Sequence, residues 1–483
     1  MKICFVNSAA LETMQPPLGL GYIASYLRKY DEDKHKMKVV DEDTGERAEK
    51  EIEKFNPDVV AITSTTPAIC RAIEIVNFVK NNYPDVSVII GGNHVTPIPE
   101  QSAREINADV IVVGEGEITF FELIQSLKND KLKHSNLKNI KGVCYKNDGN
   151  IILTKPRPFI KDLDTIPFPA RDLFDMEFYI KAQNIMNKKI WKLTQMMTGR
   201  GCPYNCVFCT CPLVHKHITR FHSPEYVIRE IEFLIKKYKV EAVKIMDDTF
   251  TISKGRARKI CEMIIERGIN EKISFGIQSR TDQIKEEDRS FLKLLKEANC
   301  VEIGFGFESG SPKILKFLKA NTTTVEDNSR AIMLTKEAGI GIFGNFMMGA
   351  VGETLEDIKM TIDFIRKHKE MIDGMGIFIV QAYPGTQLWD ICKEKRLLKD
   401  IKWNDFIVDH FATTKKAPKC FSDVFTDEEL IKLHREVMGV ALESYSWKIK
   451  LKKTIKNPIK IITVGVPYFK YKIKNMLGLG KAY

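Results

Sequence analysis

The chain has 483 residues, of which 44% are hydrophobic and 28% are charged. This composition is typical of globular proteins and excludes a disordered chain, and the length predicts two or three domains. No apolar run reaches the roughly 18 residues of a membrane-spanning helix, and the first apolar stretch is too short for a secretory signal. The net charge is +11, but ten lysines and no acidic residue follow Trp447, so the first 447 residues carry only +1.

Residues 1–135 alternate short hydrophobic strands with helices. This alternation predicts a doubly wound parallel sheet of the Rossmann or flavodoxin type, an α/β fold. The strands are expected at 2–7, 36–43, 58–66, 87–92 and 108–116, and the helices at 18–30, 68–83 and 118–129.

Residues 136–187 have a different pattern. A hairpin with an Asp-Gly turn is expected over 142–154, because that dipeptide favours tight turns between alternating strands. The proline-rich stretch 156–174 has no period and predicts a linker that lies over a neighbouring domain.

Residues 188–390 contain a second series of strands and helices. Six β/α repeats predict a partial (β/α)6 TIM-type barrel, with its chemistry at the carboxyl ends of the strands. A mainly helical region, 391–446, and a basic, apolar tail, 447–483, follow. The barrel strands are expected at 192–199, 242–248, 273–279, 300–308, 341–349 and 374–383.

Four of the eleven cysteines lie within ten positions, and an odd total without a secretory signal argues against a disulfide framework. Cys202, Cys206 and Cys209 have the spacing C-x3-C-x2-C and follow the first barrel strand. Three thiolates on one loop can each bind one iron of a cubane cluster and leave the fourth iron open. Structural zinc is the alternative, with Cys211 as fourth ligand, although such sites usually use two separated cysteine pairs.

Four peptides carry a resemblance to a known family: GRGCPYNCVFCTCP (199–212), IMDDTFT (245–251), GFESG (306–310) and FMMGAVGET (346–354). Together they resemble the radical S-adenosylmethionine (SAM) superfamily over about residues 190–390. The resemblance implies a [4Fe–4S] cluster on the three cysteines and reductive cleavage of SAM to methionine and a 5′-deoxyadenosyl radical. It also implies an external electron donor such as a flavodoxin or ferredoxin.

The same resemblance implies a SAM site at the ends of barrel strands two, three, four and six. Paired aspartates would accept from the SAM ammonium, an arginine would pair with its carboxylate, and groups after strand six would cradle adenine. A glutamate and a serine after strand four would bind the ribose hydroxyls or other polar groups of SAM. The implied residues are Asp247, Asp248, Arg280, Glu308, Ser309, Gln381, Ala382 and Tyr383.

The N-terminal domain resembles the cobalamin-binding domain that precedes many radical SAM enzymes, through PPLGLGYIASYL (16–27), ITSTT (62–66), GGNH (91–94) and GEGE (114–117). These segments fall at carboxyl ends of strands or in the following loops, where doubly wound sheets bind ligands. The implied contacts are Pro17, Leu18, Gly19, Gly21, Ser64, Thr65, Thr66, Gly91, Gly92, Gly114, Glu115 and Gly116.

The sequence departs from the histidine-ligating cobalamin domains, which carry D-x-H-x-x-G where this chain has 16–21 without histidine. Cobalt would therefore lack that axial ligand. This is the pattern of the radical SAM subgroup, and equally of a domain that has lost cobalamin. His94 is interpreted as an ordinary loop histidine. A dinucleotide site on Gly19, Gly21 and Asp41 is disfavoured, because the first strand ends near Asn7, too far from the glycines.

The tail 447–483 interleaves lysine with apolar residues, a pattern that favours an anionic membrane surface. Pro458 and Pro467 would interrupt a continuous helix. The absence of arginine argues against nucleic acid, and a merely solvated tail stays open. The sequence thus predicts a cytoplasmic protein with peripheral membrane contact through the tail.

The sequence and the two resemblances together predict a cobalamin-dependent radical SAM enzyme that methylates an unactivated carbon of a small-molecule or lipid-like substrate. Radical cyclisation, carbon–carbon coupling or rearrangement without methyl transfer is the enzymatic alternative. A zinc-stabilised binding protein is the non-enzymatic one.

Overall fold

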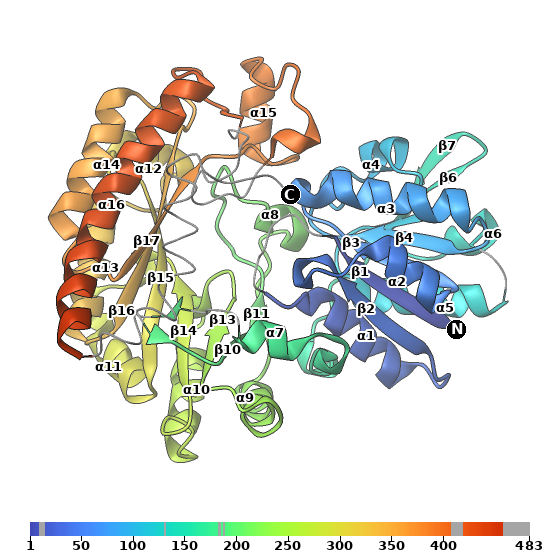
Figure 1. The fold of residues 1–483 in the computed structure, drawn as a ribbon, viewed down its shortest axis with the longest axis horizontal. Coiled ribbons are helices and arrows are strands. Elements are labelled where there is room, and N and C mark those ends of the chain that lie inside the picture. The colour runs from blue at the N-terminus through green and yellow to red at the C-terminus, as the bar shows by residue number, and fades with distance from the viewer. Residues whose placement is uncertain (9–14, 130–131, 182–184, 187–188, 407–418, 457–483) are drawn as a thin grey trace.

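The computed structural model describes residues 1–8, 15–129, 132–181, 185–186, 189–406 and 419–456. Two lobes lie side by side, an N-terminal lobe and a barrel lobe, with the short helix α8 (Cys211–His215) between them (Figure 1). The predicted membrane-contacting tail lies outside the described residues from 457 onward. None of the described helices combines the length and apolar character that crossing a membrane requires.

The N-terminal lobe is built on a seven-stranded sheet with the order β2-β1-β3-β4-β5-β6-β7. Its first five strands are parallel, and the order 2-1-3-4-5 is that of flavodoxin-like folds, as predicted. The hairpin β6–β7 adds two antiparallel strands to the edge of this sheet. The strands are β1 (Lys2–Asn7), β2 (Lys36–Asp41), β3 (Val59–Thr63), β4 (Ser87–Gly91), β5 (Val110–Val112), β6 (Val143–Asn147) and β7 (Asn150–Leu153).

Helices cover both faces of this sheet, so its central strands are hydrophobic on both sides. α1 (Leu18–Tyr30) and α5 (Gly116–Asn129) pack on one face, and α2 (Ala48–Phe55), α3 (Ile69–Asn82) and α4 (Pro99–Glu105) on the other. The sequence did not predict α2 and α4, because each is short and buries only two residues. A four-residue helix, α6 (His134–Leu137), precedes the hairpin.

The barrel lobe contains six parallel strands in the order β10-β13-β14-β15-β16-β17, which confirms the partial barrel. Large apolar side chains on the outer face pack under the surrounding helices. The strands are β10 (Leu193–Met196), β13 (Ala242–Ile245), β14 (Ser274–Ser279), β15 (Cys300–Glu308), β16 (Gly341–Met348) and β17 (Gly374–Ile379). The helices are α9 (Pro224–Tyr238), α10 (Lys254–Glu266), α11 (Arg289–Glu297), α12 (Pro312–Leu318), α13 (Val325–Glu337), α14 (Leu355–His368), α15 (Gln387–Glu394) and α16 (Asp427–Lys456).

The segment between the lobes contacts both of them. Ile160, Leu163 and Ile166 pack against α1. Ten residues downstream of Ile160 the chain turns, and Arg171 inserts into the barrel lobe, where it donates to the Gln195 carbonyl (2.6 Å) and to Glu230 (3.0 Å). The remaining elements here are α7 (Met176–Lys181) and the two-residue strands β8 (Ile185–Met186) and β9 (Lys189–Ile190).

The chain returns to the N-terminal lobe after α15. The Trp403 ring lies 4.7 Å from the His94 ring, edge to face, and its indole N–H donates to Glu105 (2.8 Å). His94 is buried, and burial lowers its pKa to about 4. The N-terminal lobe is therefore contacted by the segment that precedes the barrel in the sequence and by the segment that follows α15.

Candidate active site

The loop that carries the clustered cysteines follows the first barrel strand. We call residues 199–211 the cluster loop. It is closed at its base by a two-stranded ribbon of β11 (Gly199–Arg200) and β12 (Arg220–Phe221). Gly201 has φ +89°, and a Cβ there would lie 2.1 Å from the Ile218 carbonyl oxygen. Only glycine fits, so the tight return of the chain at this point depends on it.

The thiols of Cys202, Cys206 and Cys209 lie close enough to influence one another. Burial, together with the charges of Cys206, Asp248 and Cys202, raises the pKa of Cys209 to about 12, although the Cys211 amide hydrogen bond lowers it. Cys211 is more buried and is hydrogen-bonded to Asp248, which with burial raises its pKa. Cys211 thus has a partner in Asp248, while its backbone N–H donates to the Cys209 sulfur (3.4 Å).

Zinc and an iron–sulfur cubane require different arrangements of the thiols. Among the described residues, no three or more His, Cys, Asp and Glu side chains are grouped so as to hold a single metal ion. A four-cysteine zinc site requires all thiolates to converge on one ion, whereas each cubane thiolate binds a different iron. Cys202, Cys206 and Cys209 are half-buried, free thiols on one loop.

The two strand-two aspartates differ in environment. Asp247 is buried and accepts hydrogen bonds from the Thr198 amide (2.5 Å), the Thr198 hydroxyl (2.5 Å) and the Gly199 amide (2.9 Å). Its oxygens hold the start of the cluster loop, and its expected contact with SAM stays a prediction. Asp248 is exposed and accepts from the Gly201 amide (3.0 Å), and its contact with SAM also stays a prediction.

Arg280 is also engaged within the protein. Its guanidinium stacks 3.6 Å from the centre of the Tyr204 ring and donates to the Cys206 sulfur at 3.2 Å. Its other N–H groups donate to Asp282, Thr322 and Thr323. The structure therefore places Arg280 against the cluster loop, and its expected pairing with the SAM carboxylate stays a prediction.

The residues after β15 bind one another. Lys319 donates to Glu308 (2.7 Å) in a buried ion pair, and Glu308 has φ +58°. Ser309 is buried, with its hydroxyl 3.1 Å from that of Thr361, and it accepts from the Ser311 amide (3.1 Å). Ser309 thus holds the turn after β15, and the expected contacts of Glu308 and Ser309 with SAM stay predictions.

Gln381, after β17, keeps a free acceptor. Its side chain is buried, and its Oε1 has no hydrogen-bond partner among the described residues. Ala382 is fully buried in an apolar cluster, and Tyr383 lies parallel to Phe406 with ring centres 6.0 Å apart. A buried acceptor usually has a hydrogen-bond partner. The Gln381 Oε1 could therefore accept a hydrogen bond from a bound ligand.

The expected corrin contacts separate into open and closed positions. A Cβ on Gly19 or Gly114 would meet nothing within 4 Å, so these positions are open. A Cβ on Gly92 would lie 2.6 Å from the Ser64 oxygen, which brings the two loops together. Pro17 precedes α1, Leu18 is buried, and Thr66 lies 3.2 Å from His94.

Gly21 and Gly116 lie in close contact with neighbouring side chains, and their expected contacts with a corrin stay predictions. A Cβ on Gly21 would lie 2.9 Å from both Phe174 and Pro169, and one on Gly116 would lie 2.7 Å from Ile23. A Cβ on Gly91 would lie 3.5 Å from Val112, which is an ordinary van der Waals distance. In the loop after β3, the Ser64 hydroxyl donates to the Thr65 carbonyl (3.0 Å).

Glu115 binds arginines of the barrel lobe. It accepts from Arg200 (2.9 Å) and from both terminal nitrogens of Arg220 (2.9 and 2.8 Å), and Arg200 also donates to Glu117 (2.6 Å). Burial alone would raise the pKa of Glu115, but hydrogen bonds and charges from the two arginines lower it to about 2. The sequence predicts Glu115 as a corrin contact and does not reveal its two arginine partners, because they lie far from it along the chain.

The dinucleotide alternative does not fit the structure. β1 ends at Asn7, and Gly19 and Gly21 lie inside helix α1. Asp41 is buried and accepts from Asn7 (2.9 Å) and from the Tyr179 hydroxyl. Its carboxylate is therefore not available for a ribose.

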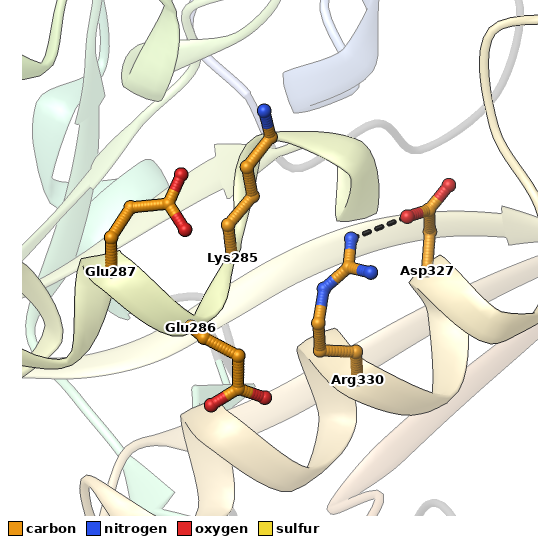
Figure 2. Close-up of a pocket in the computed structure, with 5 residues that line it drawn as sticks. All are labelled: Lys285, Glu286, Glu287, Asp327 and Arg330. Carbon is orange, nitrogen blue, oxygen red and sulfur yellow. Dashed lines mark hydrogen bonds and ion pairs between the residues drawn. The ribbon is translucent and has the colours of Figure 1, made fainter.

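A shallow hollow of about 330 Å³ lies beside η7 (Glu286–Asp288) and the start of α13 (Figure 2). Its lining is charged and in part self-paired, since Arg330 donates to Asp327 and to the Ile284 carbonyl. Its lining residues are Lys285, Glu286, Glu287, Asp327 and Arg330. It shares no residue with the predicted site.

Two family models match the chain. The radical SAM superfamily model matches residues 196–365, and the B12 binding domain model matches residues 6–124. An uncharacterized methyltransferase, PH0819 of Pyrococcus horikoshii, is 37% identical over 429 residues, covering 88% of this chain and 87% of that relative. The bacteriochlorophyllide d C-8(2)-methyltransferase of Chlorobaculum tepidum is 27% identical, over 84% of this chain and 82% of its own length.

Solved structures match in fold. The cobalamin-dependent SAM radical enzyme OxsB gives a TM-score of 0.72 at 20% identity, over 99% of this chain and 72% of OxsB. The radical SAM methyltransferase TsrM from Kitasatospora setae gives 0.68 at 18% identity, over 83% and 77%. With its three-cysteine cluster loop at the head of a six-stranded barrel, the chain belongs to the radical SAM superfamily and carries a B12-binding domain ahead of the radical SAM core.

Proposed function

We propose that this protein is a cobalamin-dependent radical SAM methyltransferase that acts on an unactivated carbon. One observation carries the proposal: the cluster loop and the corrin-type loops, on separate lobes, are in direct contact through Glu115 and Arg200. Methyl transfer by two cofactors requires both to reach one substrate. Relatives named as methyltransferases support the assignment, among them the cytidylyl-2-hydroxyethylphosphonate methyltransferase of Streptomyces wedmorensis.

The residues present fit the cofactors. Cys202, Cys206 and Cys209 would hold three irons, while Asp248 and the unpartnered Gln381 Oε1 remain available to SAM. On the N-terminal lobe, Gly19 and Gly114 leave open space at the strand ends. When bound, the cluster and SAM supply a 5′-deoxyadenosyl radical, and a corrin supplies the methyl group.

The chain itself orients these groups. Arg280 stacks on Tyr204 and donates to the Cys206 sulfur, which fixes the middle of the cluster loop. Asp247 fixes its start. Hydrogen bonds to a cluster sulfur also tune its reduction potential, so Arg280 would influence the potential as well as the geometry.

The second candidate is radical-mediated cyclisation without methyl transfer. The anaerobic magnesium-protoporphyrin IX monomethyl ester cyclase of Cereibacter sphaeroides is 27% identical over 93% of this chain and 72% of that relative, which favours keeping this outcome. The two are separated by product: S-adenosylhomocysteine accompanies methylation, whereas deoxyadenosine alone accompanies cyclisation.

The decisive experiment is anaerobic purification and reconstitution, with iron, sulfide and corrinoid analysis. We expect about four iron and four sulfide per chain, bound corrinoid, and deoxyadenosine after addition of SAM and a reductant. Tetrahedral zinc without sulfide, or no deoxyadenosine, would contradict the proposal.

The basic tail suggests a membrane and a lipid-like substrate, and the cluster requires an electron donor. We propose an external flavodoxin or ferredoxin as electron donor, a lipid-like substrate, and peripheral contact with an anionic membrane through residues 447–483. Deleting 447–483, which removes all ten lysines of the tail, should abolish co-sedimentation with anionic liposomes and spare cluster content. Unchanged sedimentation would contradict the membrane proposal.

A further inference from the structure

Four buried charges join the two lobes next to the cluster loop. We call Glu115, Glu117, Arg200 and Arg220 the interlobe bridge. Glu115 accepts from both arginines and Glu117 from Arg200, at 2.6–2.9 Å. Each of the four side chains is at most 10% exposed.

The bridge is attached at the base of the cluster loop. Arg200 lies two residues before Cys202, and Arg220 pairs with it across the β11–β12 ribbon that closes the loop. The two glutamates flank Gly116, where α5 begins after β5. The bridge thus links the strand-end loop of one lobe to the ribbon of the other.

A third segment is fastened at the same place. Arg220 also donates to the Ile160 carbonyl (2.9 Å), and the Ile160 amide donates to Glu115 (3.4 Å). The guanidinium groups lie over aromatic rings, Arg200 5.4 Å from Tyr22 and Arg220 4.5 Å from Phe159. Glu115, Arg200 and Arg220 are therefore each held by more than one partner.

Buried ion pairs contribute little net stability, because desolvation offsets much of their attraction. Their best-attested role is to fix one arrangement, since any other leaves a buried charge unpaired. Two carboxylates against two guanidinium groups balance charge, and the forked geometry of arginine allows few alternative positions.

We propose that the interlobe bridge sets the position of the cluster loop relative to the strand-end loops of the B12-binding domain. Its four members are positioning residues. If the proposed function holds, they fix the separation between the two cofactors; the positioning itself does not depend on either cofactor.

The test uses the full chain, with and without anaerobic reconstitution, and hydrogen exchange by mass spectrometry. The variants are Glu115→Gln and Glu117→Gln. The control is Glu230→Gln, which breaks an equally buried pair with Arg171 that joins the linker to α9. We expect Glu115→Gln to speed amide exchange in residues 199–211 by about tenfold. Glu230→Gln should lower the melting temperature and leave exchange in 199–211 unchanged.

The second variant guards against misfolding. In Glu117→Gln, Glu115 still binds both arginines, so a smaller increase in exchange in the same segment is expected. Unchanged exchange in 199–211 for either folded glutamine variant, with melting lowered as in Glu230→Gln, would overturn the proposal. Because exchange is also measured without cofactors, a failed reconstitution would count against the proposed function and not against the bridge.

Discussion

The carboxyl edges of the two parallel sheets are built differently. In the barrel lobe, polar side chains at the strand ends bind within the lobe: Asp247 holds the Thr198 and Gly199 amides, and Lys319 holds Glu308. In the N-terminal lobe, the edge has open glycines such as Gly19 and Gly114, and its Glu115 binds arginines of the other lobe. Charged side chains at the barrel edge thus hold the loops in place, whereas the glycines of the N-terminal edge leave room for a flat ligand.

The largest expected effect concerns the cysteines of the barrel edge. Cys202→Ala, Cys206→Ala and Cys209→Ala should each lose most iron and all deoxyadenosine formation, because each removes the ligand of one iron. Cys211→Ser is the matched control and should keep both, since that thiol is engaged with Asp248. Iron and sulfide analysis measures this, and equal losses in all four variants would restore the zinc alternative.

The next effect tests the contact between the two edges by pH. The folded pKa of Glu115 is about 2, below its ordinary value of 4.5, so the stabilisation is complete above pH 4.5 and is lost as pH falls toward 2. Relative to Glu115→Gln, wild type should gain about 3 kcal/mol that disappears across this window.

Denaturant unfolding of both proteins at several pH values between 7 and 2 measures this difference. A difference that stays constant down to pH 2 would contradict the assigned partners of Glu115.

A smaller effect separates the adjacent aspartates. Asp247→Asn should cost about 1–3 kcal/mol of unfolding free energy, because an amide nitrogen replaces a buried acceptor. Asp248→Asn, at an exposed position, should change stability by less than about 0.5 kcal/mol and weaken SAM binding. Denaturant titration and SAM binding to the reconstituted protein measure the two quantities, and reversed results would exchange their roles.

The smallest effect concerns the open N-terminal edge. Gly19→Ala replaces a glycine in helix α1 where a Cβ meets nothing, so unfolding free energy should rise by about 0.5–1 kcal/mol. Corrinoid retention should fall, because the methyl group enters the space assigned to the ligand. Unaltered retention on gel filtration would place the corrin elsewhere.

Much of the fold could be predicted from the sequence, because strands buried on both faces and amphipathic helices leave strong patterns. β1 and α1 were predicted at their observed limits, as were the six barrel strands to within a few residues at most ends. Helices with few buried residues, such as α2, leave no such pattern.

The site was predicted less completely. The cysteine spacing identifies the cluster loop because all three ligands are local. Polar strand ends are ambiguous: the sequence does not show that Asp247 is buried and Asp248 exposed, or which loop amide each of them accepts from. The interlobe bridge joins residues 83–105 positions apart, so its pairing depends on the relative placement of the lobes and leaves no local signal.

The double attachment of the N-terminal lobe, through the linker at Arg171 and through Trp403 on His94, limits how the protein can be recombined. A chimera that exchanges residues 1–135 as a cassette would separate Glu115 and His94 from partners that remain in the recipient. Exchange would succeed only between donors that share these contacts, so the two halves are expected to have evolved as one inherited unit.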